Sequence, residues 1–232
     1  MTMEHFVRRP GAVLKNFESV PLPGMDGLQQ FSNSIYQQLD LENNLSDFPV
    51  ETRNRIAFVM ARQITRISQI LGLSIPEEKL IRIATADQQK MVPLIGIGYL
   101  INYDEDQQRL IKRRQIIVNP GYLSKIASGW QNPLKQMINE AALETDLAHD
   151  LYHIRESTLF PNRKKTAVIN FNIYMEREQF LKKWANSRDE KAAEIFACMT
   201  SKYRPKNTLL EKIVYSLNGI KTGYNLFLMK IY

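Results

Sequence analysis

The chain lacks several sequence features that particular classes of protein require, including paired cysteines and long apolar runs. Its 232 residues include a single cysteine, Cys198, so no disulfide framework of the kind found in small secreted domains can form within it. It contains no run of eighteen apolar residues, which argues against a transmembrane helix. The first residues, "MTMEHFVRRPGAVLKNF", lack the apolar core of a secretory signal. We therefore expect a cytoplasmic protein that does not associate with membranes.

Motifs for phosphate binding and for nucleophilic catalysis are missing too. Gly96 and Gly98 have neither the spacing nor the following helix of a phosphate-binding loop. Cys198 lies in the apolar run "IFACM", which is typical of a buried structural cysteine rather than a catalytic thiolate. No zinc finger or RNA-recognition signature occurs. A chemical function must come from other residues.

Positive charge is concentrated at one end of the chain. The formal net charge is +7, yet residues 1–154 carry a net charge of −1 and residues 155–232 a net charge of +8. Such a basic segment can attract nucleic acid or an acidic partner through a long-range field. A solvated surface that keeps the protein in solution explains the same residues. Both interpretations remain open at this point.

Apolar spacing and turn residues predict an α+β protein. Residues 1–48 are rich in Pro, Gly, Gln and Asn and predict an irregular N-terminal arm with one short helix near residues 28–39. Residues 49–232 form the expected main domain. Strands are expected at 91–103 and 114–120, flanking a charged turn. Helices are expected at 50–71, where Gly72 ends the pattern, and at 121–128, 133–156, 188–203 and 208–218.

The stretch "ETDLAHDLYHIRE" holds two of the three histidines, His149 and His153. Residues four apart lie on one face of a helix, so the two imidazoles can bind one zinc ion at ~2.0–2.1 Å. A third ligand must come from elsewhere, and His5 on the N-terminal arm is a poor candidate. Glu190 is a better one, because it lies on the helix of "SRDEKAAEIFA". Glu194, one turn later, could orient His149 through its other ring nitrogen.

These motifs resemble those of a known family. "LAHDLYH" is similar to the "LAHELGH" helix of the ImmA/IrrE-like zinc metallopeptidases, and "EKAAEIFA" resembles the helix that carries their third zinc ligand. The resemblance covers about residues 90–200. It implies a zincin-like fold, in which a small, mostly antiparallel sheet packs on a pair of metal-bearing helices, here with an added N-terminal helix and C-terminal helical segment. It also implies that His149, His153 and Glu190 bind Zn²⁺, with Glu194 supporting His149.

The resemblance further implies a zinc-dependent hydrolase, a peptidase that acts on a protein or peptide substrate. Asp150 stands where the family has glutamate, and Tyr152 stands where glycine is common. Asp150 would take a proton from the activated water, but its stem is shorter by ~1.5 Å. The alternative is a catalytically silent zincin-like module that binds a protein or nucleic acid through residues 155–232. The sequence does not separate the two and indicates no oligomeric state.

Other interpretations of the same residues find less support. The pair His149–Asp150 also occurs in HD phosphohydrolases, but the further histidine which they need upstream could only be His5. Di-iron bundles place acid-x-x-His motifs on two helices, whereas both copies here lie on one. The histidines could also be purely structural.

Overall fold

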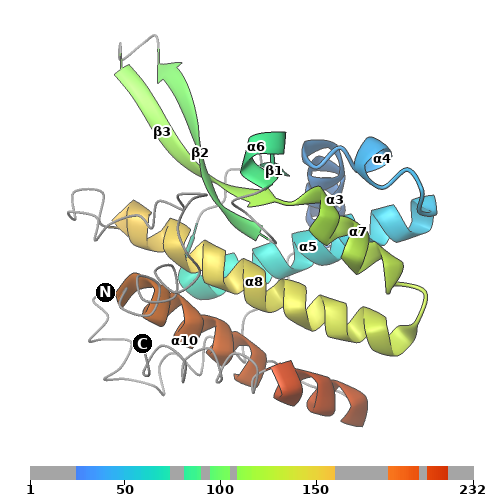
Figure 1. The fold of residues 1–232 in the computed structure, drawn as a ribbon. Helices are drawn as coiled ribbons and strands as arrows, with labels where there is room; N and C mark the ends of the chain where they lie inside the picture. The colour runs from blue at the N-terminus through green and yellow to red at the C-terminus, as the bar shows by residue number, and fades with distance from the viewer. Residues whose placement is uncertain are drawn as a thin grey trace.

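The computed structural model describes residues 25–73, 81–89, 95–104, 109–159, 188–203 and 208–218. Helices dominate these residues, and one small sheet lies against them (Figure 1). None of the described helices combines the length and the apolar character needed to cross a lipid bilayer. The fold is thus α+β with a helical majority, and the coarse expectation from the sequence is confirmed.

The long helix α5 (Val50–Leu71) forms one side of the hydrophobic core. Its apolar residues recur at helical spacing and are buried: Ile56, Val59, Met60, Ile64, Ile67, Ile70 and Leu71. Gly72 ends the helix in the left-handed conformation with φ of 66°, which costs a residue without Cβ little. The next amide, that of Leu73, donates to the Ser68 carbonyl at 2.8 Å. The predicted helix and its glycine stop are confirmed.

The helix α3 (Met25–Gln38) packs on α5, and the short helix α4 (Leu41–Asn44) follows it. The apolar side of α3 is buried in the main core. It carries Leu28, Phe31 and Ile35, and Leu39 follows directly after the helix. The short helix predicted near residues 28–39 is present. Residues 25–48 are therefore part of the packed body and not of an irregular arm, because this apolar stripe needs a partner. The arm expected for residues 1–24 lies outside the described residues.

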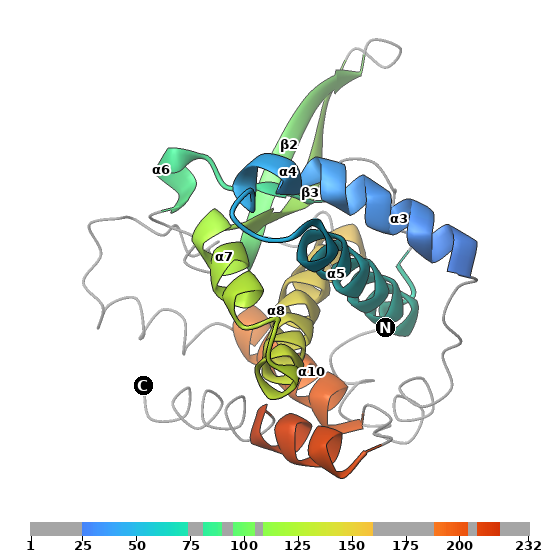
Figure 2. The ribbon, with the colours of Figure 1, turned by 90° about the vertical axis from the view of Figure 1, so that its right-hand side faces the viewer.

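The sheet has three described strands in the order β1-β3-β2. The strand β2 (Ile95–Asp104) pairs antiparallel with β3 (Arg109–Val118) over ten residues, while the short β1 (Ile81–Ile83) pairs parallel with β3. The long hairpin projects away from the helices (Figures 1 and 2). Residues 109–113, which the sequence assigns to a turn, belong to β3. Their basic side chains hide the strand pattern, while the backbone ladder to β2 defines it. The helix α6 (Ala86–Gln89) follows β1.

Two asparagines begin the helices that follow the sheet. The Asn119 side chain accepts a hydrogen bond from the Gly121 amide at 2.8 Å and caps α7 (Pro120–Ser128). The Asn132 side chain accepts from the Leu134 and Lys135 amides, both at 3.0 Å, at the start of α8 (Pro133–Leu159). Each helix has proline at its first position, where no amide hydrogen is needed. Both helices are confirmed, and α8 continues three residues beyond the predicted end.

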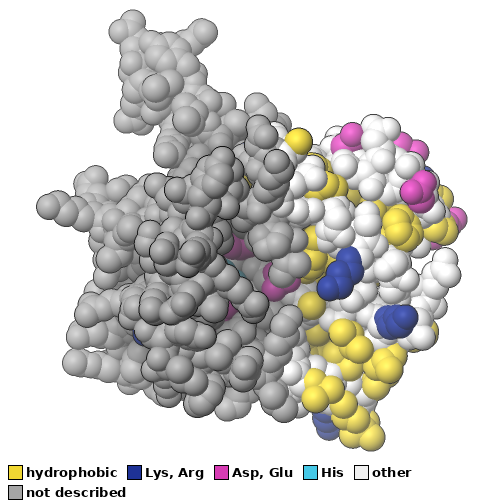
Figure 3. Space-filling model, in the orientation of Figure 1, with side chains coloured by type: hydrophobic (Ala, Val, Ile, Leu, Met, Phe, Trp, Pro, Cys, Tyr) yellow, Lys and Arg dark blue, Asp and Glu magenta, His cyan; other side chains and the backbone are white. Residues whose placement is uncertain are grey.

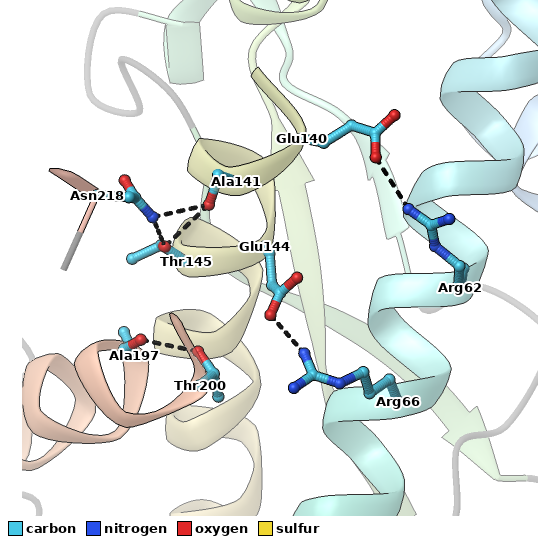
Figure 4. A network of polar contacts seen from close by, with 9 residues as sticks. All are labelled: Arg62, Arg66, Glu140, Ala141, Glu144, Thr145, Ala197, Thr200 and Asn218. Carbon is cyan, nitrogen blue, oxygen red and sulfur yellow. Dashed lines mark hydrogen bonds and ion pairs between the residues drawn. The ribbon is translucent and has the colours of Figure 1, made fainter. Parts of the chain in front are cut away.

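The last described elements pack on α8. The helix α10 (Arg188–Tyr203) has the bounds predicted from the sequence and lies along the C-terminal half of α8 (Figure 1). A further helix spans residues 209–218 and contacts the N-terminal half of α8. Its Asn218 donates to the Ala141 carbonyl at 2.9 Å and to Thr145 (Figure 4). In the sequence, Ser187 is a plausible N-cap of α10 and residues 168–174 have a strand-like pattern, but both lie outside the described residues.

Two ion pairs fix α8 on α5. Arg66 binds Glu144, whose side chain is fully buried, and Arg62 binds Glu140 at 3.0 Å (Figure 4). The two carboxylates lie one turn apart on α8, and the two guanidinium groups lie one turn apart on α5. This pairing sets the register of the two helices. It therefore also fixes where the turn of α8 that carries the histidines lies relative to α5.

Candidate metal centre

The two histidines lie on the C-terminal half of α8, where this helix meets α10. The contact between the helices is built from small residues, Ala148 on α8 and Ala192, Ala193 and Ala197 on α10, all of which are buried. The lack of bulk lets the backbones approach closely. Phe196 fills the space below, with its ring 5.5 Å from that of Tyr152. Tyr152, which replaces the glycine common in the family resembled, is therefore a core residue that joins α8 to α10.

His149, His153 and Glu190 converge at this contact. Nε2 of His149 lies 3.2 Å from Nε2 of His153 and 3.0 Å from Oε2 of Glu190. Nε2 of His153 lies 3.4 Å from Oε1 of Glu190. The three side chains are between 14% and 21% exposed. Together they could hold a metal ion. Among the described residues, no other group of three or more His, Cys, Asp or Glu side chains is close enough together to do this.

These separations are close to those expected around one tetrahedral ion. Two ligand atoms that are each ~2.0–2.1 Å from zinc, at the tetrahedral angle, lie about 3.3–3.4 Å from one another. The two Nε2 atoms are 3.2 Å apart, while Nε2 of His149 lies 3.0 Å from Oε2 and Nε2 of His153 lies 3.4 Å from Oε1 of Glu190, so both oxygens of this carboxylate face the histidines. Two nitrogens and one carboxylate are also ligands that zinc accepts. The donor set thus fits a divalent ion in both spacing and chemistry, although the identity of the ion does not follow.

Glu194 lies on the opposite side of the His149 ring from Glu190. Its Oε1 is 3.8 Å from Nδ1 of His149, which is too far for a hydrogen bond but close enough for the negative charge to act on the ring. Glu194 is 8% exposed. Its position matches the supporting role expected from the sequence, and the role itself stays a prediction.

Asp150 is the most isolated carboxyl of the site. It is 7% exposed. Burial raises the pKa of Asp150 to about 6. The neighbouring His149 and His153 act to lower this pKa, but the negative charges of Asp146 and Glu190 add to the effect of burial. A carboxyl with a raised pKa fits a place where it exchanges a proton with a water molecule or a ligand.

The charges of the site also shift its other groups. Burial alone would lower the pKa of His149, but the hydrogen bond to Glu190 and the charges of Asp150, Glu190 and Glu194 outweigh it and raise the pKa to about 9. For Glu190, burial acts to raise the pKa, yet the hydrogen bonds to His149 and His153 hold it well below its usual range. Without a metal ion, His149 and Glu190 are thus a charged pair at neutral pH.

Sequence reasoning missed one contact beside the site. The Tyr122 hydroxyl of α7 donates to Oδ2 of Asp146 at 2.8 Å. Burial, the charge of Asp146 and this hydrogen bond raise the pKa of Tyr122 well above its usual value. Asp146 could have been noted because it lies one turn before Asp150 on the same helix. Tyr122 could not, because no spacing relates it to the histidines. His5, which the sequence offered only as a poor candidate for the third ligand, lies outside the described part of the chain.

Comparison with known proteins adds no relative to this picture. The chain matches no model of a known protein family, no curated protein and no solved structure. Its function therefore has to be inferred from the geometry of the site.

Proposed function

We propose that this protein is a zincin-like, zinc-dependent hydrolase, a peptidase in which His149, His153 and Glu190 hold the ion. The observation that carries the proposal is the close approach of these three side chains at the contact of two helices, where the nearest donor atoms of each pair are 3.0 to 3.4 Å apart. The order of the two motifs along the chain resembles that of the ImmA/IrrE-like metallopeptidases and supports the same assignment.

A charged hydrogen-bond cluster without metal would have similar distances. Two features favour a metal site over such a cluster. The two histidines direct the same nitrogen, Nε2, at one another and at Glu190, an arrangement in which at least one of the two nitrogens must carry a proton if no cation lies between them. Asp150, the residue after His149, places a largely buried carboxyl beside this point. A cation with a coordinated water satisfies all four groups.

The chain's own residues then have separate tasks. Bound zinc supplies Lewis acidity and lowers the pKa of a water molecule. The Asp150 carboxylate, whose pKa of about 6 leaves it mostly ionised at neutral pH, accepts a proton from water and returns it to the leaving amine. Glu194 favours the His149 tautomer that keeps its proton on Nδ1. The strand β2, at one end of the strand order, offers backbone groups that can align an extended peptide.

Peptide cleavage by zinc-loaded protein tests the proposal. The wild type and Asp150→Glu are expected to cleave members of a mixed peptide library. Asp150→Asn should bind zinc equally well and cleave at least about 100-fold more slowly, because the proton acceptor is lost. If neither the wild type nor Asp150→Glu cleaves any peptide while zinc is bound, the peptidase proposal fails. The alternative of a silent binding module would then remain, and the salt dependence of nucleic-acid binding would test it.

A further inference from the structure

Large apolar side chains gather at the end of the molecule remote from the candidate metal centre. In Figure 3 they cover the region where the N-terminal end of α8 and the helix 209–218 lie side by side. Six of the eight large apolar side chains that are exposed among the described residues belong to these two helices, with exposed fractions between 39% and 74%: Leu134, Ile138, Leu209, Leu210, Ile213 and Leu217. We call these six residues the apolar face.

The apolar face rests on a firm base. The helix 209–218 is held to α8 by Val214 and Tyr215, which are buried against Ala141 and Met137. Asn218 adds hydrogen bonds to Ala141 and Thr145. The inner side of this helix is therefore already occupied, and its exposed leucines and isoleucine are a separate outer surface.

The area of the apolar face indicates what kind of partner it can bind. Its six side chains leave on the order of 500 Å² of apolar surface in water, near the upper end of the largest patch on a typical monomer, about 300–600 Å². A standard protein interface buries about 800 Å² on each partner. In homodimers about 65% of that area is apolar, which again corresponds to about 500 Å² for each copy. The apolar face thus has the area that a stable homodimer needs.

We propose that the apolar face is the contact of a symmetric dimer, with a second copy of this chain as its occupant. In a twofold interface the same surface of each copy meets itself. Here α8 and the helix 209–218 of one copy pack on the same pair of helices in the other. The proposal is independent of the metal centre, which lies at the other half of α8.

Sedimentation velocity on the full chain tests this proposal. The mass of the wild type is expected to rise from 27.0 kDa toward twice that value as the concentration increases from about 1 to 100 µM. The double variant Ile213→Glu/Leu217→Glu should raise the dimer dissociation constant at least about 100-fold, because it places charges in the buried centre of the interface. Leu134→Glu/Ile138→Glu, on the other helix, should have the same effect.

Val50→Glu is the matched control, since Val50 is similarly exposed, at 45%, but lies at the start of α5. This variant should dimerise like the wild type. Circular dichroism and thermal melting should show that all variants keep the wild-type fold, because every altered side chain is at least 45% exposed. A wild type that stays monomeric at about 100 µM overturns the proposal. A dimer that survives both double variants overturns it equally.

Discussion

Zinc binding should displace one proton from the site at neutral pH. The pKa of His149 in the metal-free protein is about 9, so about 97% of this imidazole is protonated at pH 7.5. A metal ion requires Nε2 without its proton. Binding should therefore release about one proton from His149 at pH 7.5 and about half a proton at pH 9. The apparent zinc affinity should rise about tenfold for each pH unit between 7 and 8.5.

Isothermal titration calorimetry can count these protons. Binding enthalpies measured at pH 7.5 in buffers of different ionisation enthalpy give a slope equal to the number of protons released. Glu190→Gln is the informative variant, because it removes the hydrogen-bonding carboxylate that raises the pKa of His149. Burial, the largest influence on this pKa, then dominates and lowers it. The imidazole signals of metal-free His149 in an NMR titration should move from a midpoint near 9 to a clearly lower one.

Tight zinc binding at pH 7.5 with no proton release would refute this reasoning. It would mean that His149 is either neutral in the metal-free protein or not a ligand. The NMR titration separates these two cases. A midpoint below 7 in the wild type would show that the charged pair with Glu190 is absent, whereas a midpoint near 9 that zinc leaves unchanged would show that His149 does not bind the ion.

Three further measurements follow from the structure. In the metal-free protein, the raised pKa of His149 should contribute up to about 3 kcal/mol of stability that is fully present below pH 6.5 and lost as the pH rises through about 9; urea denaturation at three pH values would show it, and equal stability at all three would contradict it. Arg66→Met should destabilise the fold by about 3–5 kcal/mol, because it removes the guanidinium group that pairs with Glu144, whose side chain is 0% exposed. Arg62→Met should cost less than about 1 kcal/mol of stability, because its pair with Glu140 is partly solvated. Asn119→Ala should cost about 1 kcal/mol through the lost cap of α7, whereas Asn119→Ser should restore most of that loss, and an unchanged thermal midpoint in both variants would show that the cap is dispensable.

Local patterns in the sequence predicted the helices well. In α5 the apolar spacing and Gly72 give both the buried face and the end of the helix. The starts of α8 and α10 and the end of α10 were predicted as well, whereas α8 continues three residues beyond its predicted end. Tertiary context decided the cases that failed. Residues 25–48 look irregular in composition, yet the stripe of Leu28, Phe31 and Ile35 packs on α5. The basic residues of β3 conceal a strand that only its pairing with β2 defines.

The candidate metal centre was predictable for a different reason. His149 and His153 lie on one helix, so their proximity follows from helical geometry alone. Glu190 lies 37 residues after His153; it was chosen because it lies on a predicted helix with Glu194 one turn later, and the resemblance of this motif to that of a family supported the choice. The contact of Tyr122 with Asp146 and the ion pair of Arg66 with Glu144 have no pattern in the sequence. They depend on how α5, α7 and α8 pack.

X-ray absorption at the zinc edge, on protein reconstituted with one equivalent of zinc, tests the metal centre most directly. We expect one zinc ion per chain, bound by two imidazole nitrogens and a carboxylate oxygen at ~2.0–2.1 Å. The imidazole scattering should fall by half in His149→Ala and in His153→Ala, and the carboxylate contribution should be lost in Glu190→Gln. Failure to retain stoichiometric zinc, or a spectrum without imidazole scattering, would contradict the assignment of this site as a metal centre.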